Sequence, residues 1–420
     1  NAFSGEVSEE TLRKLYDLMV ANADDLAAIL TSEQGKPLAE AKGEINSCIA
    51  YLDWFAEEAR RAYGDVVPPY KAGARTLVIK QAVGVCSAIT PWNFPASMIA
   101  RKFAPAMAAG CTMVIKPASA TPLIALALVD LAMRAGIPAG VINMVTGDAG
   151  VIGDLLATHP LIRKVSFTGS TEVGKMLMAK AAGSMKRVSM ELGGNAPFIV
   201  FDDADLDQAV AGAMASKFRN AGQTCVCANR ILVQDGIYDA FAEKLAKAAA
   251  ALKVGEGAGE GVQQGPLINI KAVEKVEELV ADATAKGAKV LQGGKRHALG
   301  DNFYEPTVLA HVTPAMKVAK EEIFGPVAPL FRFKDEAEAI RLANDTEYGL
   351  AAYFYARDIG RIWRVAEGLE YGMVSANDGM LTTETAPFGG VKESGMGREG
   401  SRYGLDEYLD IKYIQMAGLA

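Results

Sequence analysis

The sequence places one cysteine where its thiol could act as a nucleophile. Cys225 stands in the polar, glycine-containing stretch Phe218-Arg-Asn-Ala-Gly-Gln-Thr-Cys-Val-Cys227, between a predicted helix and a predicted strand. A thiol in such a loop can be exposed and activated. Cys227 is expected on the buried side of the strand, with a redox-sensitive pair with Cys225 as the alternative. The remaining cysteines stand among apolar residues and are expected to be structural: Cys48, Cys86 and Cys111.

A nucleophilic cysteine needs a base, and the histidines do not supply one. The residues His159, His297 and His311 have no metal-ligand spacing and no nearby acidic motif, which argues against a Cys–His pair and against a zinc site. Glu191 ends a predicted strand beside glycines that leave room for a ligand. Its carboxylate could activate water. For this segment alone, a glutamate that faces solvent or pairs with a lysine is the ordinary alternative.

A turn between a predicted strand and a predicted helix could bind phosphate. The segment Phe167-Thr-Gly-Ser-Thr-Glu-Val-Gly174 would leave backbone N–H groups free at a helix start, where the helix dipole favours an anion. It lacks the G-x-G-x-x-G spacing of many dinucleotide sites. It nearly matches a P-loop, but Met176 replaces the hydroxyl residue that would bind magnesium. A P-loop phosphotransferase is therefore a remote alternative, and a plain tight turn is another.

Composition favours a large globular protein and disfavours nucleic-acid and membrane-surface roles. The chain has 420 residues, of which 50% are hydrophobic and 22% charged, and this predicts two or three domains. A net charge of -7 gives no basic field for nucleic acid or an anionic membrane surface. No apolar stretch approaches the roughly 18 residues of a membrane span. Few, irregularly spaced cysteines and the lack of a signal-peptide pattern indicate a reducing compartment, and we expect the cytoplasm.

Strands and helices alternate along most of the chain. The first series has predicted strands at Cys111–Lys116, Val141–Thr146 and Lys164–Phe167, with helices at Pro122–Ala135 and from Ala149. The second series has predicted strands at Ala196–Phe201 and Arg230–Val233, with helices at Leu206–Phe218, Tyr238–Leu252 and Ile270–Lys286. Such alternation is typical of parallel sheets. The sequence therefore predicts an α/β protein with a doubly wound parallel sheet and a second α/β domain.

Both ends of the chain depart from this alternation. Helical patterns run from Glu9 to Leu30 and from Ala39 to about Tyr63. The β-rich stretch Thr76–Ile89 predicts two strands that pass around Gln81, and Tyr403–Gln415 alternates like a strand. These segments predict a small separate β element.

Seven longer motifs follow one another along the chain: Ile89-Thr-Pro-Trp-Asn-Phe-Pro95, Lys116-Pro-Ala-Ser119, Phe167-Thr-Gly-Ser170, Glu191-Leu-Gly-Gly194, Gly222-Gln-Thr-Cys225, Glu322-Ile-Phe-Gly-Pro326 and Pro387-Phe-Gly-Gly390. In order and spacing they resemble the aldehyde dehydrogenase family, and most closely its succinate-semialdehyde branch. The similarity spans essentially the whole chain.

This resemblance implies the oxidation of an aldehyde to a carboxylic acid. Cys225 would attack the aldehyde carbon, while Asn93 and the Cys225 backbone N–H would hold the oxyanion. Loss of hydride to a nicotinamide would leave a thioester, which water activated by Glu191 would hydrolyse.

The resemblance also implies a nicotinamide cofactor and no metal. The residues expected to line its site are Trp92, Lys116, Gly169, Ser170, Leu192, Glu322 and Phe324. Lys116 and Glu322 would face the riboses. Ser119 stands where many NAD-specific relatives carry a glutamate that would repel a 2′-phosphate. We therefore expect NADP first and NAD second.

Two arginines and a threonine match substrate-binding positions of the semialdehyde branch. Arg101 and Arg219 could hold a carboxylate at the far end of a short aldehyde, although an arbitrary arginine more often forms a surface or interdomain ion pair. Thr382 falls where some relatives have a substrate-binding serine, so the choice between four- and five-carbon semialdehydes stays open. Glutarate semialdehyde or a broader range of aldehydes is the alternative substrate class.

The family fold implies three parts. A cofactor-binding domain would comprise residues 1–69 and 86–190, a catalytic domain residues 191–396, and an oligomerisation element residues 70–85 and 397–420. The last would pair subunits edge to edge in a homodimer or homotetramer. By the same resemblance, further residues would precede Asn1.

Overall fold

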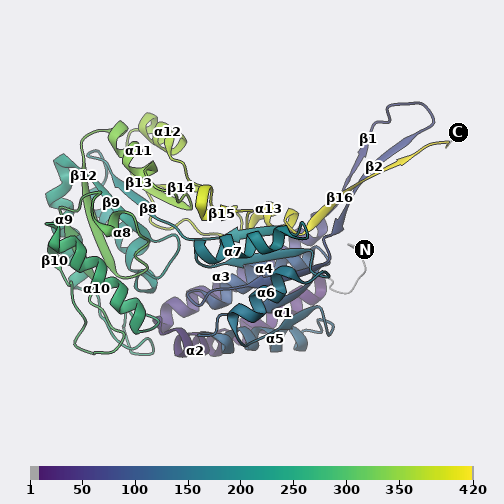
Figure 1. Ribbon diagram of the computed structural model, residues 1–420, viewed down its shortest axis with the longest axis horizontal. Helices are drawn as coiled ribbons and strands as arrows, with labels where there is room; N and C mark the ends of the chain where they lie inside the picture. Colours follow the sequence, from purple (N-terminus) through teal and green to yellow (C-terminus); the bar gives the residue numbers. More distant parts are fainter. Residues whose placement is uncertain (1–8, 419–420) are drawn as a thin grey trace.

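The computed structural model describes residues 9–418 and builds them around three sheets (Figure 1). Two larger sheets form the two lobes of an elongated body, and a three-stranded sheet projects from it as an arm. The two lobes confirm the predicted α/β fold with parallel sheets.

The first lobe is built on a six-stranded sheet. In order across the sheet, its strands are β15 (Gly395–Met396), β7 (Arg187–Glu191), β6 (Lys164–Thr168), β3 (Val85–Ile89), β4 (Thr112–Lys116) and β5 (Ile142–Met144). All neighbours are parallel except β15, which runs antiparallel to β7. From β3 the chain moves outward to β5 and then returns to β6, on the other side of β3. A topological switch point therefore lies between β3 and β6.

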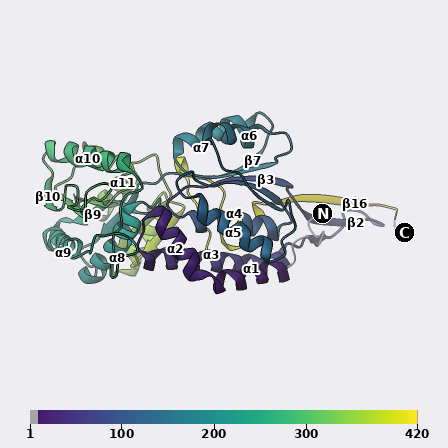
Figure 2. The ribbon, with the colours of Figure 1, turned by 90° about the horizontal axis from the view of Figure 1, so that it is seen from below.

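Helices cover both faces of this sheet, as the doubly wound prediction requires (Figure 2). On one face lie α6 (Ala149–Thr158) and α7 (Thr171–Ala182); on the other lie α4 (Pro95–Ala108) and α5 (Pro122–Arg134), with α1 (Glu9–Ala21), α2 (Ala23–Gln34) and α3 (Leu38–Glu58) packed outside them. The sheet shares one buried apolar core with α4 and α5, to which Phe103, Met113 and Leu128 contribute.

The prediction of a single helix from Glu9 to Leu30 is wrong in one respect, because this segment is divided between two helices. The break falls at Asn22, whose side-chain amide donates a 2.7 Å hydrogen bond to the main-chain oxygen of Leu18. Asparagine competes for backbone hydrogen bonds in this way and so favours helix ends. Helical periodicity continues across the break, and the apolar pattern alone does not reveal it.

The second lobe is built on a seven-stranded sheet. In order, its strands are β10 (Lys289–Gln292), β11 (Thr307–Ala310), β12 (Val327–Phe333), β9 (Ala228–Gln234), β8 (Ala196–Val200), β13 (Ala351–Tyr355) and β14 (Met373–Ala376). Only the edge strand β10 is antiparallel to its neighbour. Successive residues of β8 face opposite cores: Phe198 faces the one beneath α8 (Leu206–Phe218) and α9 (Tyr238–Ala250). Ile199 faces the other, beneath α10 (Ile270–Ala285), α11 (Glu336–Asn344) and α12 (Ile359–Gly368).

The arm consists of β1 (Asp65–Val67), β2 (Arg75–Ala82) and β16 (Leu409–Met416), all antiparallel. Its bounds correct the sequence prediction in two places. The first strand of the β-rich stretch continues through Gln81, and the break falls at Val83 and Gly84 instead. The start of the predicted C-terminal strand is the helix α13 (Ser401–Asp406), which contacts α3 and α4 of the body.

The predicted division of the chain into parts meets two exceptions at its boundaries, in addition to α13, which lies in residues 397–420 but packs on the body. β1 belongs to the arm sheet but precedes residue 70, and β15 pairs with the first lobe although it lies in the range expected for the second. The three-part division otherwise stays a prediction. Within residues 9–418, no helix has the length and apolar character that would carry it across a membrane.

Candidate active site

Four neighbouring strands of the first lobe carry expected site residues at their carboxyl ends. Asn93 follows β3, Lys116 ends β4, Ser170 follows β6 and Glu191 ends β7. In open α/β sheets, ligands bind outside this edge, at the switch point. Ser170 also caps α7, because its Oγ accepts a 3.4 Å hydrogen bond from the N–H of Val173. Strand order thus gathers side chains that are far apart in the sequence.

Cys225 reaches this edge on a strained loop of the second lobe. The loop follows α8 and precedes β9, and Asn220, Ala221 and Gly222 have left-handed backbone conformations with φ of 51°, 54° and 75°. Such conformations are unfavourable for non-glycine residues and often mark functional sites. A Cβ on residue 222 would also collide with the main-chain oxygen of Gly325. Glycine is therefore required there.

The loop between β7 and β8 packs directly against Cys225. A Cβ on Gly194 would collide with the main-chain oxygen of Cys225, so only glycine permits this approach. The strands that follow the two loops, β8 and β9, start side by side, with Ala196 opposite Ala228. Their amino ends face the carboxyl edge of the first sheet, and Cys225 therefore lies where the two lobes meet.

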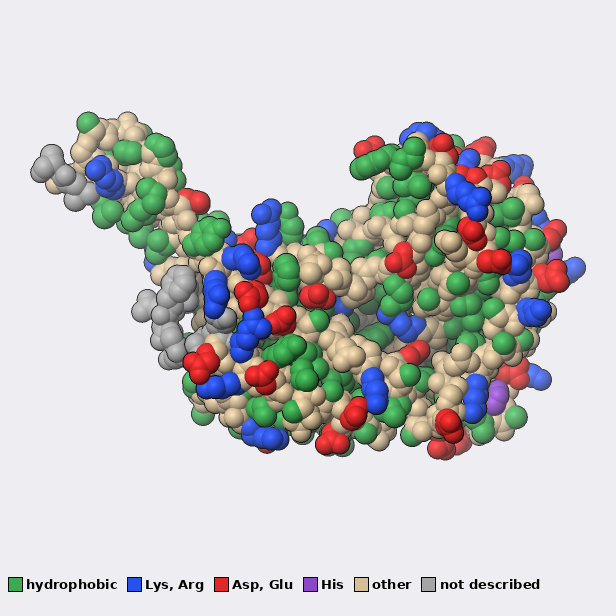
Figure 3. All heavy atoms as spheres, turned by 180° about the vertical axis from the view of Figure 1, so that it is seen from behind, with side chains coloured by type: hydrophobic (Ala, Val, Ile, Leu, Met, Phe, Trp, Pro, Cys, Tyr) green, Lys and Arg blue, Asp and Glu red, His purple; other side chains and the backbone are tan. Residues whose placement is uncertain are grey.

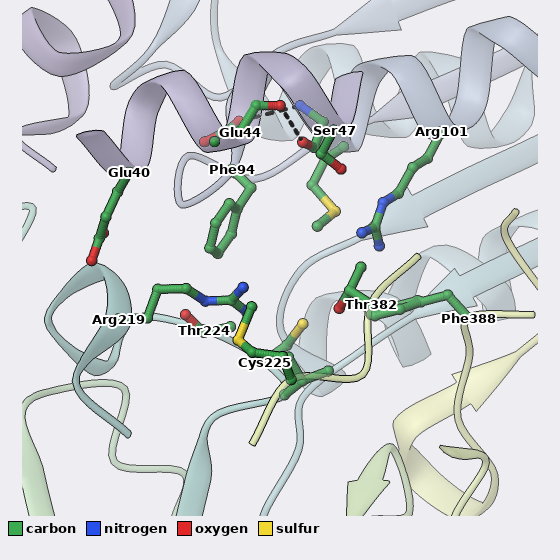
Figure 4. Close-up of a pocket in the computed structure, with 15 residues that line it drawn as sticks. Glu40, Glu44, Ser47, Phe94, Arg101, Arg219, Thr224, Cys225, Thr382 and Phe388 are labelled. Atoms are coloured by element: carbon green, nitrogen blue, oxygen red, sulfur yellow. Dashed lines mark hydrogen bonds between the residues drawn. The ribbon is translucent and has the colours of Figure 1, made fainter. Parts of the chain in front are cut away.

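Cys225 is half-buried and lines two cavities. The first, of about 330 Å³, extends between α3, α4 and the loop after β14 (Figure 4). The second, of about 280 Å³, opens toward the carboxyl edge of the first sheet. Met98 of α4 lines both cavities as well. A molecule in either cavity would reach the same sulfur.

The first cavity brings the two predicted arginines and the predicted threonine together. Arg101 and Arg219 lie on opposite sides of it, and Thr382 lies near Arg101 (Figure 4). Nε and Nη1 of Arg101 and Nε of Arg219 are buried and have no hydrogen-bond partner among the described residues, although Nη1 of Arg101 lies 3.9 Å from Glu399 Oε2, within ion-pair distance. The guanidinium of Arg101 also lies over the rings of Tyr51 and Phe388, at 4.9 and 4.4 Å. The cavity therefore offers free donors to an anionic group.

The second cavity collects most of the residues expected around the cofactor. It is lined by Trp92, Asn93, Gly169, Ser170, Leu192, Glu322 and Phe324, together with residues such as Thr168, Gly193 and Lys275. The rings of Trp92 and Phe324 meet edge to face with centroids 5.6 Å apart. Burial raises the pKa of Glu322 to about 7, although the N–H of Gly194 donates to its carboxylate at 3.0 Å.

The second cavity fits a nucleotide cofactor. Thr168 lines this cavity, and its buried hydroxyl has no hydrogen-bond partner within the described part of the chain. The cavity also borders the start of α7. A Cβ on Gly193 would come within 3.2 Å of Glu322 Oε2 and Thr171 Oγ1, so glycine keeps this wall open. A free hydroxyl, a helix start and an open wall are features that bind sugar hydroxyls and phosphate.

Lys116 and Ser119 line neither of these cavities. The ammonium of Lys116 donates to the main-chain oxygen of Pro117 at 2.9 Å and to Ser119 Oγ at 3.5 Å. Burial lowers the pKa of Lys116, and the carboxylate of Asp148 opposes this. The two residues stand together beyond β4, farther along the same sheet edge.

Glu191 is buried and also lines neither cavity. Both carboxylate oxygens lack a hydrogen-bond partner among residues 9–418. Burial and the nearby Glu399 raise its pKa well above the ordinary value, while Lys102 and Arg101 oppose the shift. A raised pKa suits a group that must accept a proton.

The thiol of Cys225 has an unfavourable environment for ionisation in the free protein. Burial, followed by the charge of Glu322, raises its pKa to about 12, and Arg101 and Arg219 act in the opposite direction. Cys227 is buried immediately before β9, where its thiol donates to the main-chain oxygen of Lys217 at 3.4 Å. Both thiols are free, and Cys48, Cys86 and Cys111 are buried as predicted.

Several site residues are absent from the sequence-based set. Glu40, Glu44 and Ser47 of α3 line the first cavity, and Gln223 accepts a 3.0 Å hydrogen bond from the Asn93 side chain through its main-chain oxygen. The α3 residues stand in an ordinary amphipathic pattern, and polar residues on a helix resemble a solvated face. No signal short of the tertiary structure identifies them.

The phosphotransferase alternative finds no support in the turn that resembles a P-loop. No group of three metal-binding side chains is present among the residues that the structure describes. The phosphate-like turn has the predicted strand-to-helix geometry, but Met176 is on α7 and is 43% exposed without a hydroxyl to offer.

Known proteins resemble this chain closely. The sequence matches the aldehyde dehydrogenase family over residues 2–414. It is 64% identical over 403 residues to the succinate-semialdehyde dehydrogenase GabD of Escherichia coli K12, whose name specifies NADP(+), and the match covers 96% of this chain and 84% of the relative. It is 61% identical over 418 residues to the glutarate-semialdehyde dehydrogenase of Pseudomonas aeruginosa, covering 100% and 86%.

A crystal structure of a succinate-semialdehyde dehydrogenase from Burkholderia pseudomallei has a TM-score of 0.97 to this chain at 61% identity, covering 99% of this chain and 88% of that one. The sequence and structure comparisons thus agree over nearly all of the molecule, and the family match spans every residue that lines the two cavities. The chain belongs to the aldehyde dehydrogenase family.

Proposed function

We propose that the protein oxidises succinate semialdehyde to succinate with NADP+, with NAD+ as the second cofactor. The observation that carries this proposal is the position of Cys225 between a cavity with free arginine donors and a cavity that fits a nucleotide. A short anionic aldehyde in the first cavity and a nicotinamide in the second would meet at one sulfur.

The thiol of Cys225 first loses its proton to water. The thiolate sulfur then forms a bond to the aldehyde carbon, and the carbonyl electron pair moves to oxygen. The side-chain amide of Asn93, buried beside the second cavity, and the Cys225 backbone N–H donate to this oxyanion. The positive charges of Arg101 and Arg219 lower the pKa of the thiol against the effect of burial.

The second cavity would hold the cofactor through Trp92, Gly169, Ser170, Leu192, Glu322 and Phe324, with Lys116 and Ser119 farther along the sheet edge. When bound, the oxidised nicotinamide supplies an acceptor for the hydride that leaves the aldehyde carbon. The substrate carbon is thereby oxidised by two electrons and remains on Cys225 as a thioester.

Hydrolysis releases the acid. Glu191 takes a proton from a water molecule as its oxygen adds to the thioester carbon, and the carbon–sulfur bond then breaks to return Cys225 as thiolate. The unpartnered oxygens and raised pKa of Glu191 support this role. Since the carboxylate lines neither cavity, it acts from behind the cavity wall, through a change of side-chain conformation or a water molecule.

Arg101, Arg219 and Thr382 support an anionic semialdehyde as substrate. The two arginines present buried N–H groups without hydrogen bonds that a carboxylate would satisfy, and a buried donor left without a hydrogen bond is costly. Relatives with more than 60% identity are named for both four- and five-carbon semialdehydes, so glutarate semialdehyde is the second candidate.

Ser119 supports NADP. Its hydroxyl lies 3.5 Å from the ammonium of Lys116, which offers a positive charge and no carboxylate to a 2′-phosphate. The relative from Escherichia coli, named for NADP(+), is consistent with this choice.

The arm supports assembly into a homodimer or homotetramer. It projects from the body with apolar side chains on its surface (Figure 3). Exposed fractions reach 80% for Val66, 76% for Tyr70 and 74% for Ile411. β16 is an edge strand of the arm sheet, and a second subunit would cover both its apolar side chains and its free backbone groups.

The cysteines support a cytoplasmic location. All five are free thiols, which a reducing compartment preserves.

Replacing Glu191 by glutamine should stall the reaction at the thioester. We expect one burst of reduced cofactor per site followed by turnover about 100- to 10,000-fold slower, the usual contribution of a general base. In the unaltered protein, deacylation should rise with pH through the raised pKa of Glu191, because only the ionised carboxylate accepts a proton. Stopped-flow absorbance over a pH series measures both effects. Cys225→Ala, which should give no burst, is the control, and undiminished deacylation in the glutamine variant removes Glu191 as the base.

Replacing Arg101 or Arg219 by methionine should separate anionic from neutral substrates. We expect kcat/KM for succinate semialdehyde to fall about 10- to 100-fold, since a hydrogen bond to a charged group contributes about 1.5–3 kcal/mol. The value for butanal should change little. Arg341→Met, at an arginine on α11 outside both cavities, is the matched control. Equal losses for both aldehydes would mean that the arginines are structural.

Replacing Ser119 by glutamate should reverse the cofactor preference. A carboxylate near the 2′-phosphate should lower kcat/KM for NADP+ about 10- to 100-fold by charge repulsion, with NAD+ little affected. Ser119→Ala removes the hydroxyl without adding charge and should keep the preference for NADP+. Initial rates with each cofactor decide the point, and an unchanged ratio in the glutamate variant would place the 2′-phosphate elsewhere.

The double replacement Ile411→Glu and Tyr413→Glu should reduce the size of the assembly. Both side chains are exposed on alternate positions of β16, so charges there would oppose contact with a second subunit. Light scattering after size-exclusion chromatography measures the mass. Lys412→Glu changes charge on the other face of the strand and should leave the mass unchanged. An assembly of the same size in both variants would show that the arm is not the interface.

A further inference from the structure

A buried ion pair at the border of the first cavity takes no part in the chemistry described above. Lys36, in the loop between α2 and α3, donates from Nζ to Glu44 Oε2 at 2.7 Å, and both side chains are completely buried. Removing two charges from water is unfavourable, and an apolar pair of similar size often gives equal stability. The pair therefore calls for an explanation other than stability.

The ammonium of Lys36 is bound to the residue that would hold the oxyanion. Its Nζ donates a second hydrogen bond, of 2.7 Å, to the main-chain oxygen of Asn93. The side-chain amide of Asn220 donates to the same oxygen at 3.0 Å. The side chain of Asn93 is held from the other direction, because its Nδ2 donates to the main-chain oxygen of Gln223 at 3.0 Å. The Asn93 peptide and its side-chain amide are thus fixed from both lobes.

Gln34 closes this set of hydrogen bonds into a ring. Its Oε1 accepts from the backbone N–H of Lys36 at 2.9 Å, and its Nε2 donates to Asn220 Oδ1 at 2.9 Å. Asn220 donates to the main-chain oxygen of Gln223 as well, at 3.2 Å. Asn220 is one of the left-handed residues in the loop that carries Cys225. The ring therefore links the position of Asn93 to the conformation of the Cys225 loop.

Glu44 fixes the start of the helix that follows Asn93. Its Oε1 accepts hydrogen bonds from the backbone N–H groups of Ala96 and Ser97, at 2.9 and 3.2 Å. These groups belong to the first turn of α4, where a negative charge is favourable. Lys36 binds the other oxygen of the same carboxylate, and its ammonium also lies 3.8 Å from the ring centroid of Phe94. One ion pair therefore holds the chain on both sides of Asn93.

We propose that Lys36 and Glu44 are positioning residues for the oxyanion donor Asn93. The inference rests on the role of Asn93 in the proposed function. Oxyanion donors act because they are fixed in advance toward the place where charge develops, and a displacement of about 1 Å can cost about 100-fold in rate. Lys36 lines neither cavity and acts on Asn93 through its main-chain oxygen. Glu44 borders the first cavity, but it acts on this segment through the backbone N–H groups of Ala96 and Ser97.

A double-mutant cycle tests the proposal. The rate of hydride transfer is measured in single turnovers with succinate semialdehyde and NADP+ for Lys36→Met, Asn93→Ala and the combination of both. Lys36→Met should lower this rate about 10- to 100-fold while cofactor affinity stays unchanged. In the Asn93→Ala background, Lys36→Met should have almost no further effect, because the group through which it acts is absent.

Lys164→Met is the matched control. Lys164 is a buried lysine of β6 that pairs with Glu407 at 3.1 Å, outside both cavities. Loss of this lysine should lower thermal stability in the same way, and any effect on hydride transfer should be the same with and without Asn93. If Lys164→Met were coupled to Asn93→Ala as strongly as Lys36→Met is, the proposal would be overturned, because the coupling would then reflect general destabilisation.

A second variant covers the case in which Lys36→Met leaves Glu44 unpaired and does not fold. The combination Lys36→Met with Glu44→Gln removes both charges, and the glutamine oxygen can still accept from Ala96 and Ser97. This variant should fold and show the same coupling to Asn93→Ala; independent effects would overturn the inference. If Asn93→Ala itself keeps full hydride transfer, the proposed role of Asn93 fails instead, and the two failures are thus distinguishable.

Discussion

The close approach of two backbone segments at Cys225 is the constraint on which the site depends. Gly194 lies against the main-chain oxygen of Cys225. Because glycine has no Cβ, the loop between β7 and β8 can pack directly against the loop that carries Cys225 into β9. The amino ends of β8 and β9 then face the carboxyl edge of the first sheet. Both cavities exist because these two edges meet and leave room on either side of the sulfur.

Burial sets the electrostatics of this junction. Cys225, Glu191 and Glu322 all have raised pKa values, with burial as the largest cause, and such shifts are typical of functional sites. The arginines of the first cavity partly offset the effect on the thiol. Charges in such a buried site interact strongly with bound reactants, because little water is present to screen them.

The layers outside the sheets contribute directly to the site. α3 lines the first cavity, and the loop before it holds the main-chain oxygen of Asn93 through Lys36. Each of these contacts crosses from the N-terminal helices to a loop of another element, so the geometry of the site depends on the packing of the whole first lobe. Helices that cover a sheet thus also hold the residues at its carboxyl edge in place.

The sequence by itself determined the fold class, the positions of most helices and strands, the family, and the residue types at the reacting centre. It could do so because apolar periodicity and motif spacing are local properties; α8 spans Leu206–Phe218 as predicted. The helix break at Asn22, the start of the C-terminal strand and the role of α13 were missed, since local pattern does not report which surface a segment packs on.

Only the tertiary structure decided that Arg101 and Arg219 face one cavity, that Glu191 is buried outside both cavities, and that Lys36 and Glu44 lie near Asn93. These facts depend on contacts between residues that are tens to hundreds of positions apart. A polar residue on a helix has the same sequence signature whether it meets solvent or another loop, and only packing distinguishes the two.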